Sequence, residues 1–362
     1  MQPRERGLKA AFGDYLQIGC AVGGTLPDSL TPAETELVTR HFNVLTPENC
    51  MKPGPLQPEP GRFEFEAPDA LLAFASQRGM NVVGHTLVWH GQTAPWMYAP
   101  GIDRAQAQQQ LEQHIRQVVG RYRGKLQGWD VVNEALSDDD GYLRETPCWA
   151  ALGSEYLQLA FRFARETDPG VELYYNDYNI ELPAKRERTL RLIDQLDAAG
   201  ERPHGVGIQG HWILDQVPFE DISKALRIYS ELGLEVMITE LDIDLVPRPH
   251  AGADVAARAH EPGLDPYVAG CPPEVLERQA QQYERLFEIF LDRGVSRVTF
   301  WGPQDGRSWL NYWPGPRTNH PLLFDRESRP KPAYQRVLAV AERYGALAPW
   351  LAGIRTPSFG GG

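Results

Sequence analysis

The sequence predicts a single (β/α)8 TIM barrel with its catalytic cleft at the C-terminal ends of the strands. Eight short apolar runs are each followed by a helical segment of ten or more residues, and strands that alternate with helices in this way form parallel sheets. Polar residues also gather at the end of almost every run, where such a barrel carries its functional groups. With 362 residues, the chain has a length at which these barrels form one domain.

The eight predicted strands are rich in β-branched and aromatic residues, as strands usually are. They lie within residues 15–22, 41–49, 81–90, 126–135, 171–179, 205–212, 235–243 and 297–305.

The predicted helices carry recognisable start and stop signals. The first begins with a capping box formed by Thr31 and Glu34, and Pro32 occupies its first helical position. The second covers residues 68–78 and stops at a glycine. Six more are predicted at 103–122, 149–166, 184–199, 219–232, 273–293 and 332–344.

The domain organisation follows from the absence of any Ser-, Gly- or Pro-rich linker between these elements. We predict one domain over residues 1–345 and a partly flexible C-terminal tail over residues 346–362. We also expect a monomer.

Composition limits the partners. The net charge is −12, and no run of Lys or Arg stands out, which argues against nucleic acid or an anionic membrane as a partner. No stretch of about 18 apolar residues is present, so we expect no membrane span. A neutral substrate fits this balance better, and nine Trp and fourteen Tyr are more than a core needs.

Cysteines and the N-terminus bear on the compartment. The four scattered cysteines form no CxxC pair, so we expect unpaired thiols. The first sixteen residues lack the apolar segment of a signal peptide. The protein is expected to be cytoplasmic if Met1 is the native start, and secreted or periplasmic if a leader has been removed.

Polar, charged or aromatic groups end seven of the eight predicted strands. One such end is often just the start of a loop, but seven together predict a polar, aromatic-lined cleft. These ends include Glu48, Asn49, His85, Trp89, Asn133, Glu134, Asn176, Tyr178, Gln209, His211, Glu240, Asp242 and Trp301.

Two of these groups, Glu134 and Glu240, suit the hydrolysis of a glycosidic bond, which needs two carboxyl groups flanking the bond. Glu134 closes the apolar run WDVV after Asn133, and apolar surroundings favour a carboxyl group that keeps its proton. Glu240 is followed by Asp242, and His211 ends the neighbouring strand. An Asp–His–Glu arrangement would keep Glu240 ionised and oriented as a nucleophile. A salt-bridge role is the alternative for either residue alone.

The rest of the cleft resembles a sugar site, with flat apolar faces and directed hydrogen-bonding groups. The candidate faces are Trp89, Trp96, Trp301, Trp309 and Trp313. The candidate polar contacts are Glu48, Asn49, Lys52, Gln92 and Gln209. Trp129 in mid-strand and Trp149 at a helix start are expected in the core.

Metal or cofactor chemistry is the alternative use of the polar residues in the cleft. His85, His90, His211, Asp130 and Asp242 could serve as ligands, but no HxH, HExxH or paired-Cys spacing occurs. The sequence also lacks GxGxxG, P-loop and GxSxG patterns. We therefore expect no metal and no cofactor.

The motifs PENCMK, GHTLVWH, WDVVNEA, YNDYN, GIQGHW, ITELDI and PLLFD occur in this order. Together they resemble the endo-β-1,4-xylanases of glycoside hydrolase family 10, and the resemblance covers about residues 15–345. It implies a retaining enzyme that cleaves internal bonds of xylan or xylo-oligosaccharides by double displacement. The open alternatives are a related glycosidase acting on cellulose or mannan, and an inactive sugar-binding barrel.

The resemblance implies a role for each matching residue. Glu134 would be the acid/base, Glu240 the nucleophile and Asp242 the partner of His211. The sugar being cleaved would be surrounded by Lys52, His85, Trp89, Asn133, Gln209 and His211, with Asn133 holding its 2-hydroxyl. The next glycone subsite would use Glu48, Asn49, Gln92 and Trp301, and the leaving-group side would use Asn176 and Tyr178.

Departures from the family pattern lie near the glycone end. Pro53 follows Lys52 where many relatives carry Trp. The segment after Trp301 is long and aromatic, so we expect that its Trp313, Arg317 and Asn319 alter the glycone end. We expect Trp309 of the same segment to stack on the glycone. A second long loop covers residues 245–275, and its His250 and His260 are expected to be solvated.

Overall fold

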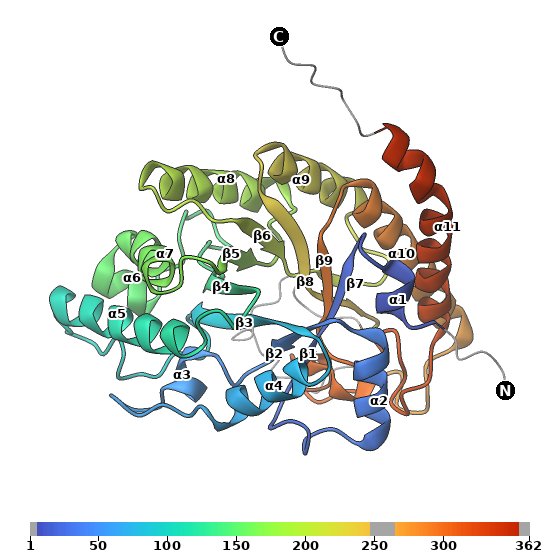
Figure 1. Cartoon of the computed structure of the whole chain (residues 1–362), viewed down its shortest axis with the longest axis horizontal. Coiled ribbons are helices and arrows are strands. Elements are labelled where there is room, and N and C mark those ends of the chain that lie inside the picture. Colours follow the sequence, from blue (N-terminus) through green and yellow to red (C-terminus); the bar gives the residue numbers. More distant parts are fainter. Residues whose placement is uncertain (1–5, 247–264, 355–362) are drawn as a thin grey trace, which may run out of the picture.

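The computed structural model describes residues 6–246 and 265–354. Eight parallel strands close into a barrel, because the first strand pairs with both the second and the last, and the sixth pairs with the strand that carries Glu240. Figure 1 shows these strands at the centre with helices around them. The ring consists of β1 (Gln17–Val22), β2 (Val44–Pro47), β3 (Asn81–Val88), β4 (Gly128–Asn133), β5 (Glu172–Asp177), β6 (Gly205–Ile208), β8 (Glu235–Asp244) and β9 (Arg297–Phe300). The predicted barrel is confirmed.

The sixth predicted strand is divided in two. Gly210, with φ +83°, separates β6 from β7 (His211–Ile213), a conformation that glycine adopts without penalty. β7 pairs with the last three residues of β8, and His211 lies opposite Asp242 in that register. The break therefore sets Gln209 and His211 on either side of a turn at the barrel mouth.

Most helices occupy their predicted positions. The capping box of Thr31 and Glu34 is present at the start of α2 (Pro32–His41). The other long helices are α4 (Glu66–Ser76), α5 (Arg104–Arg121), α8 (Pro183–Ala198), α9 (Phe219–Glu231), α10 (Pro273–Asp292) and α11 (Pro332–Ile354). Short helices are α1 (Leu8–Phe12), α3 (Pro53–Leu56), η1 (Asp305–Arg307) and η2 (Trp309–Asn311).

One predicted helix was wrong in outline. The segment expected at 149–166 forms two helices, α6 (Pro147–Leu152) and α7 (Glu155–Thr167). Gly153, at φ +64°, ends α6 in a conformation that a continuous helix cannot contain. Thr146 begins α6, since its hydroxyl accepts a hydrogen bond from the backbone N–H of Trp149.

The main core fills the layer between barrel and helices. Trp129 is 1% exposed, as expected for a core residue, and it packs where Gly84 leaves room. A Cβ on Gly84 would lie 2.2 Å from the Trp129 ring. Trp149 is only partly buried against this core. A smaller apolar cluster is formed by Val44, Val83, Tyr174 and Met237.

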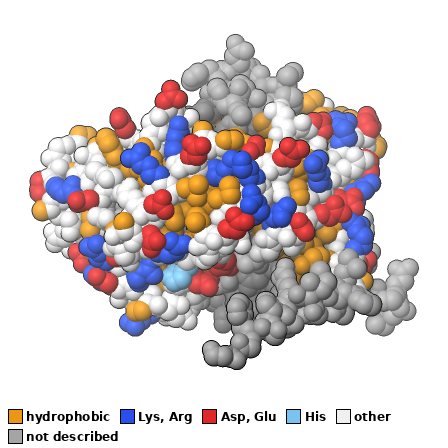
Figure 2. All heavy atoms as spheres, turned by 90° about the horizontal axis from the view of Figure 1, so that it is seen from above, with side chains coloured by type: hydrophobic (Ala, Val, Ile, Leu, Met, Phe, Trp, Pro, Cys, Tyr) orange, Lys and Arg blue, Asp and Glu red, His pale blue; other side chains and the backbone are white. Residues whose placement is uncertain are grey.

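The N-terminal helix α1 and the C-terminal helix α11 lie at one side of the barrel, where α11 packs against α1 and α10. The helix crosses residue 345, the predicted domain boundary, so the division into domain and tail stays a prediction. All four cysteines are free. No described helix is long and apolar enough to cross a bilayer. On the face in Figure 2, acidic and basic side chains are interspersed.

Candidate active site

The two candidate carboxylates lie at the same end of the barrel. Glu134 directly follows β4 and Glu240 belongs to β8, and their exposed fractions are only 4% and 5%. Two amides connect them. The Asn176 side-chain nitrogen donates to Glu240 Oε1 (2.8 Å) and to Asn133 Oδ1 (3.0 Å), and Asn133 Nδ2 donates to Glu134 Oε1 (3.2 Å).

Glu134 is surrounded by neutral donors. Trp89 Nε1 donates to its Oε2 (2.8 Å), and Gln209 Nε2 donates to its Oε1 (2.9 Å). Burial raises the pKa of Glu134, and the hydrogen bonds from Gln209 and Trp89 offset this only in part. The backbone of Glu134 also has a left-handed conformation, with φ 57°. The site thus holds a carboxyl group that favours its protonated form.

Glu240 faces an imidazole that is itself held by a carboxylate. His211 Nε2 lies 3.1 Å from Glu240 Oε2, and His211 Nδ1 lies 2.9 Å from Asp242 Oδ2. Burial lowers the pKa of His211, but Asp242 and Glu240 outweigh this and raise it to about 9. The cationic ring then donates to both carboxylates. The arrangement is the Asp–His–Glu geometry that the sequence predicts.

The electrostatic result at Glu240 is opposite to that at Glu134. Burial raises the pKa of Glu240, but the hydrogen bond from His211 and the nearby His85 and Lys52 lower it below its usual value. Glu240 is therefore held as a carboxylate.

Asn176 was expected on the leaving-group side, and its side chain is fully buried. That role stays a prediction, whereas the contacts of Asn176 within the site are clear. Its amide nitrogen binds Glu240 and Asn133, and its oxygen accepts from the hydroxyl of Thr239 (2.5 Å). Asn176 therefore orients the site from within. The signal that could have found this contact is the strand order, because Asn133 and Asn176 lie opposite each other in neighbouring parallel strands.

Tyr178 is also buried, and its hydroxyl donates to Asp138 and accepts from Arg144 (2.9 Å). Arg144 in turn reaches the backbone oxygen of Glu134 (3.4 Å). A leaving-group-side role for Tyr178 stays a prediction.

The predicted glycone residues form one cluster around Asn49. Its Oδ1 accepts from Lys52 Nζ (3.1 Å) and Gln92 Nε2 (3.3 Å), and the Lys52 ammonium lies 4.6 Å from the centroid of the Trp89 ring. Burial raises the pKa of Glu48 and lowers that of Lys52. Gly23 lies close to this cluster, because a Cβ there would lie 2.9 Å from Glu48 Oε2 and the carboxyl group would have to shift.

His85 and Trp301, two more of the predicted sugar contacts, lie against each other. The His85 Nδ1 lies 2.9 Å from Asp130 Oδ2, and the ring meets Trp301 edge-on at 5.3 Å between centroids. Within residues 6–246 and 265–354, no group of three or more His, Cys, Asp or Glu side chains could hold a metal ion. His250 and His260 lie outside the described residues.

Trp309 closes the site from the loop after β9. Its Nε1 donates to Asp242 Oδ2 (2.9 Å), and its ring stacks on Trp313 at 4.8 Å and lies 4.9 Å from the His211 ring. The sequence gives no signal for the bond to Asp242. Trp96, also expected to face sugar, instead packs against the core and donates to the Gln57 carbonyl (3.3 Å).

Arg317 and Asn319, expected to alter the glycone end, are both buried and bind Asp244, the last residue of β8. Their effect on the glycone end stays a prediction. Arg317 Nη2 donates to Asp244 Oδ2 (2.7 Å), and Asn319 Nδ2 donates to its Oδ1 (2.6 Å). Their charge and polarity therefore fix the Trp309 loop to the strand of Glu240.

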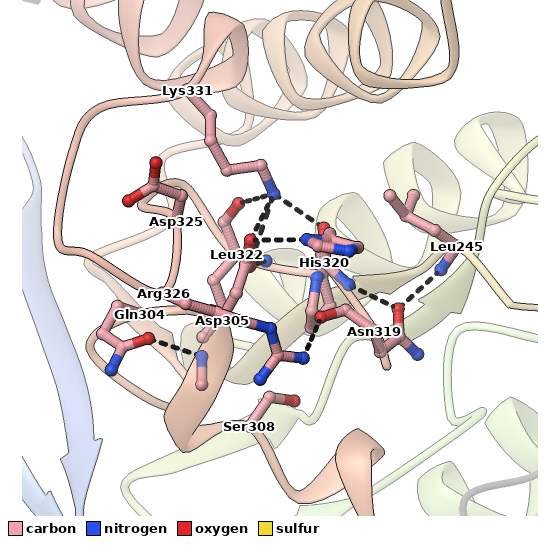
Figure 3. A network of polar contacts seen from close by, with 12 residues as sticks. Leu245, Gln304, Asp305, Ser308, Asn319, His320, Leu322, Asp325, Arg326 and Lys331 are labelled. Atoms are coloured by element: carbon pink, nitrogen blue, oxygen red, sulfur yellow. Dashed lines mark hydrogen bonds and ion pairs between the residues drawn. The ribbon is translucent and has the colours of Figure 1, made fainter. Parts of the chain in front are cut away.

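A second network anchors the same loop, as Figure 3 shows. The buried Asp305 carboxylate accepts from the backbone N–H of Leu322 (2.8 Å) and pairs with Lys331 Nζ (3.1 Å). Lys331 also donates to the carbonyls of His320 (2.7 Å) and Leu322 (2.6 Å). Because every partner is buried or nearly so, this network holds the segment between β9 and α11 together. Asn319 Oδ1 ties the same segment to β8, since it accepts from the backbone N–H of Leu245 directly after that strand (3.2 Å).

Comparison with known proteins identifies the family. The model of glycosyl hydrolase family 10 matches residues 7–340. The chain belongs to this family. It is 41% identical to a β-1,4-xylanase of Dictyoglomus thermophilum, over 91% of this chain and 90% of the relative. It is 38% identical to an endo-1,4-β-xylanase of Geobacillus stearothermophilus, over 92% and 98%.

Solved structures of family 10 agree with the barrel. A GH10 endoxylanase from a sugarcane soil metagenome superposes with a TM-score of 0.87 at 39% identity, covering 92% of this chain and all of that one. A xylanase of Paenibacillus barcinonensis, solved with a conduramine derivative, superposes with a TM-score of 0.84 at 36% identity, covering 93% and 99%. The family and fold predicted from the motifs are confirmed.

Proposed function

We infer that the protein is a retaining endo-β-1,4-xylanase that hydrolyses internal bonds of xylan, with Glu134 as acid/base and Glu240 as nucleophile. Family membership and the xylanase relatives carry the activity. The opposite pKa directions of two equally buried carboxyl groups support the assignment of roles, because such pairs divide into an acid and a charged partner.

In the first step, the Glu240 carboxylate attacks the anomeric carbon while the bond from that carbon to the glycosidic oxygen breaks. The leaving oxygen takes the proton of Glu134, which becomes a carboxylate. The product is a glycosyl ester on Glu240 and a shortened chain.

In the second step, the Glu134 carboxylate takes a proton from water while the water oxygen attacks the same carbon. The ester bond breaks, and Glu240 returns as a carboxylate stabilised by His211 and Asn176. Two inversions retain the β configuration.

The neighbours of the two carboxylates have supporting roles in this proposal. Asn133 and Gln209 hold the sugar beside Glu134, with Asn133 on the 2-hydroxyl. Lys52 and His85 hold it from the glycone side, and Glu48, Asn49, Gln92 and Trp301 form the next subsite.

The test combines substrate choice and stereochemistry. We expect reducing ends to be released from xylan, with much lower rates on carboxymethylcellulose and mannan. Proton NMR of the first product should show the β anomer before mutarotation. Faster release from cellulose or mannan contradicts the substrate, and an initial α anomer contradicts the double displacement.

A further inference from the structure

Asp242 stands between the nucleophile's histidine and a tryptophan from a distant loop. Its side chain is completely buried. A single oxygen, Oδ2, accepts from both His211 Nδ1 and Trp309 Nε1, each at 2.9 Å. The other oxygen, Oδ1, has no hydrogen-bond partner among the described residues.

We propose that Trp309 is a positioning residue for the nucleophile, because its indole N–H fixes Asp242 and thereby His211 and Glu240. This inference rests on the proposed function and adds to it a role that is distinct from stacking against sugar. The chain of contacts is continuous, from Trp309 Nε1 to Asp242 Oδ2, from His211 Nδ1 to the same oxygen, and from His211 Nε2 to Glu240 Oε2.

Two donors on one oxygen determine where that carboxylate points. Asp242 lies within β8 in register with His211, but this backbone pairing leaves the side-chain torsions free to rotate. With only His211 as donor, the carboxylate can turn about its Cβ–Cγ bond while it keeps that hydrogen bond. The second donor, approaching from the loop after β9, meets the same oxygen from another direction and fixes the position of that oxygen and the plane of the carboxylate.

Trp309 can impose this orientation because its own position is fixed. Its ring stacks on the buried Trp313 at 4.8 Å and an interplanar angle of 26°. The backbone of its loop is tied to Asp244 by Arg317 and Asn319. The indole N–H is thus held in place by contacts that do not involve His211 or Glu240.

Other titratable groups face the same site, and a substitution at Trp309 removes none of them. Around Glu240 and Asp242 these are His85 from β3, Lys52 and Glu48 from the segment after β2, Glu134 after β4, His211 from β7 and Tyr283 from α10.

Loss of the indole N–H has a predictable sign. Asp242 loses one of its two donors, so its carboxylate is less well fixed and His211 is held less firmly against Glu240. The hydrogen bond from His211 lowers the pKa of Glu240, so a weaker bond raises that pKa. The acidic limb of kcat/KM, which reports the nucleophile's ionisation in the free enzyme, should move to higher pH.

The experiment removes only the donor. Replacing Trp309 by β-(3-benzothienyl)alanine puts sulfur where the N–H stands and keeps the ring's size and stacking. We expect the acidic midpoint of kcat/KM on an aryl xylobioside to rise by about half a unit, since one hydrogen bond to a buried carboxylate is lost. Trp309→Phe provides a second variant that is genetically encoded, and the shift should have the same sign.

Tyr312→Phe is the matched control, because it changes an exposed aromatic residue of the same loop and leaves the Trp309 N–H and its stacking on Trp313 in place. Its acidic midpoint should equal that of the wild type. In an Asp242→Asn background, the Trp309→Phe change should produce no further shift, because the carboxylate through which Trp309 acts on His211 is already absent.

The outcomes separate this inference from the proposed function. A wild-type enzyme that hydrolyses xylan, with both Trp309 variants keeping its acidic midpoint, overturns the positioning role and leaves the function intact. A lower kcat or a higher KM without a change in midpoint has the same meaning, since it indicates stacking alone. A wild-type protein without activity on xylan contradicts the proposed function itself.

Discussion

Glu134 and Glu240 have almost the same exposure and lie at the same end of the barrel, yet the groups that face them differ in charge. Glu134 receives neutral donors, the indole of Trp89 and the amide of Gln209. Glu240 receives His211, whose pKa is raised to about 9, and lies near Lys52.

This difference shows that burial alone does not set a carboxyl group's pKa. Burial is the largest influence on both residues and raises both pKa values. Neutral donors leave the pKa of Glu134 raised, whereas cationic neighbours lower the pKa of Glu240 below its usual value. The side of the site that protonates and the side that attacks are therefore distinguished by the charge of their donors.

Removing each carboxylate tests the comparison most severely. Glu134→Ala should lose roughly 10²–10⁴-fold on xylan, whose leaving oxygen needs a proton. On a dinitrophenyl xylobioside, whose leaving group needs almost none, the first step should survive. A burst followed by slow turnover should then appear in stopped-flow absorbance, as a glycosyl-enzyme accumulates.

Glu240→Ala should fail on both substrates, because no covalent step remains. Equal losses for the two variants on both substrates would mean that the proposed division of roles is wrong. A leaving-group dependence confined to Glu240→Ala would reverse the roles.

Removing the cationic donor His211 should bring the pKa of Glu240 closer to that of Glu134. His211→Ala removes the donor that lowers the pKa of Glu240, so the acidic limb of kcat/KM should rise by about one unit, within the range of a nearby opposite charge. Asp242→Ala should shift it in the same direction. Thermal unfolding and pH profiles would be measured together, and folded variants with the wild-type rate and limb would exclude a catalytic role for this triad.

Trp309, whose ring lies beside His211, should also govern the preference for xylose over glucose. Trp309→Ala opens space where glucose carries its C6 hydroxymethyl group, which xylose lacks. We expect lower xylan activity and roughly a tenfold fall in the preference for xylose over glucose. A change of this size is usual when a pocket can no longer discriminate against one small extra group on the substrate. Rates on matched aryl xylobioside and cellobioside measure this, and an unchanged ratio would mean that selectivity resides elsewhere.

A smaller change tests the neutral hydrogen-bond donors around Glu134. Gln209→Ala removes a donor that favours the charged form of Glu134, so the pKa of Glu134 should rise further. The proposed acid must be protonated in the free enzyme, so the basic limb of kcat/KM should move up by about half a unit. The acidic limb serves as the internal control, and a basic limb that stays or moves down contradicts the assignment.

The barrel and the two carboxylates could be predicted because their signals are local. Strand-helix alternation and polar strand ends are properties of short segments, and parallel strands bring their ends to one edge. The break of the predicted 149–166 helix is a local feature too, but a glycine within a helical pattern does not by itself reveal a positive φ.

The missed contacts join residues that are far apart in the sequence. Asn176 and Glu240 are separated by 64 positions, and Trp309 and Asp242 by 67. Arg317 and Asn319 look like cleft residues in an aromatic loop, but only the folded chain brings them to Asp244. Side-chain pairing across loops depends on loop conformation, which hydrophobic periodicity does not encode.

The left-handed backbone of Glu134, at φ 57°, has an evolutionary consequence. A non-glycine residue in this region costs about 1–3 kcal/mol of folding free energy, and glycine avoids that cost. Glycine at position 134 would remove this strain, but it would also leave the donors of Trp89, Gln209 and Asn133 without their acceptor. Part of the free energy of these hydrogen bonds thus offsets a strained backbone, and laboratory evolution toward thermostability should include an activity screen to retain the carboxyl group.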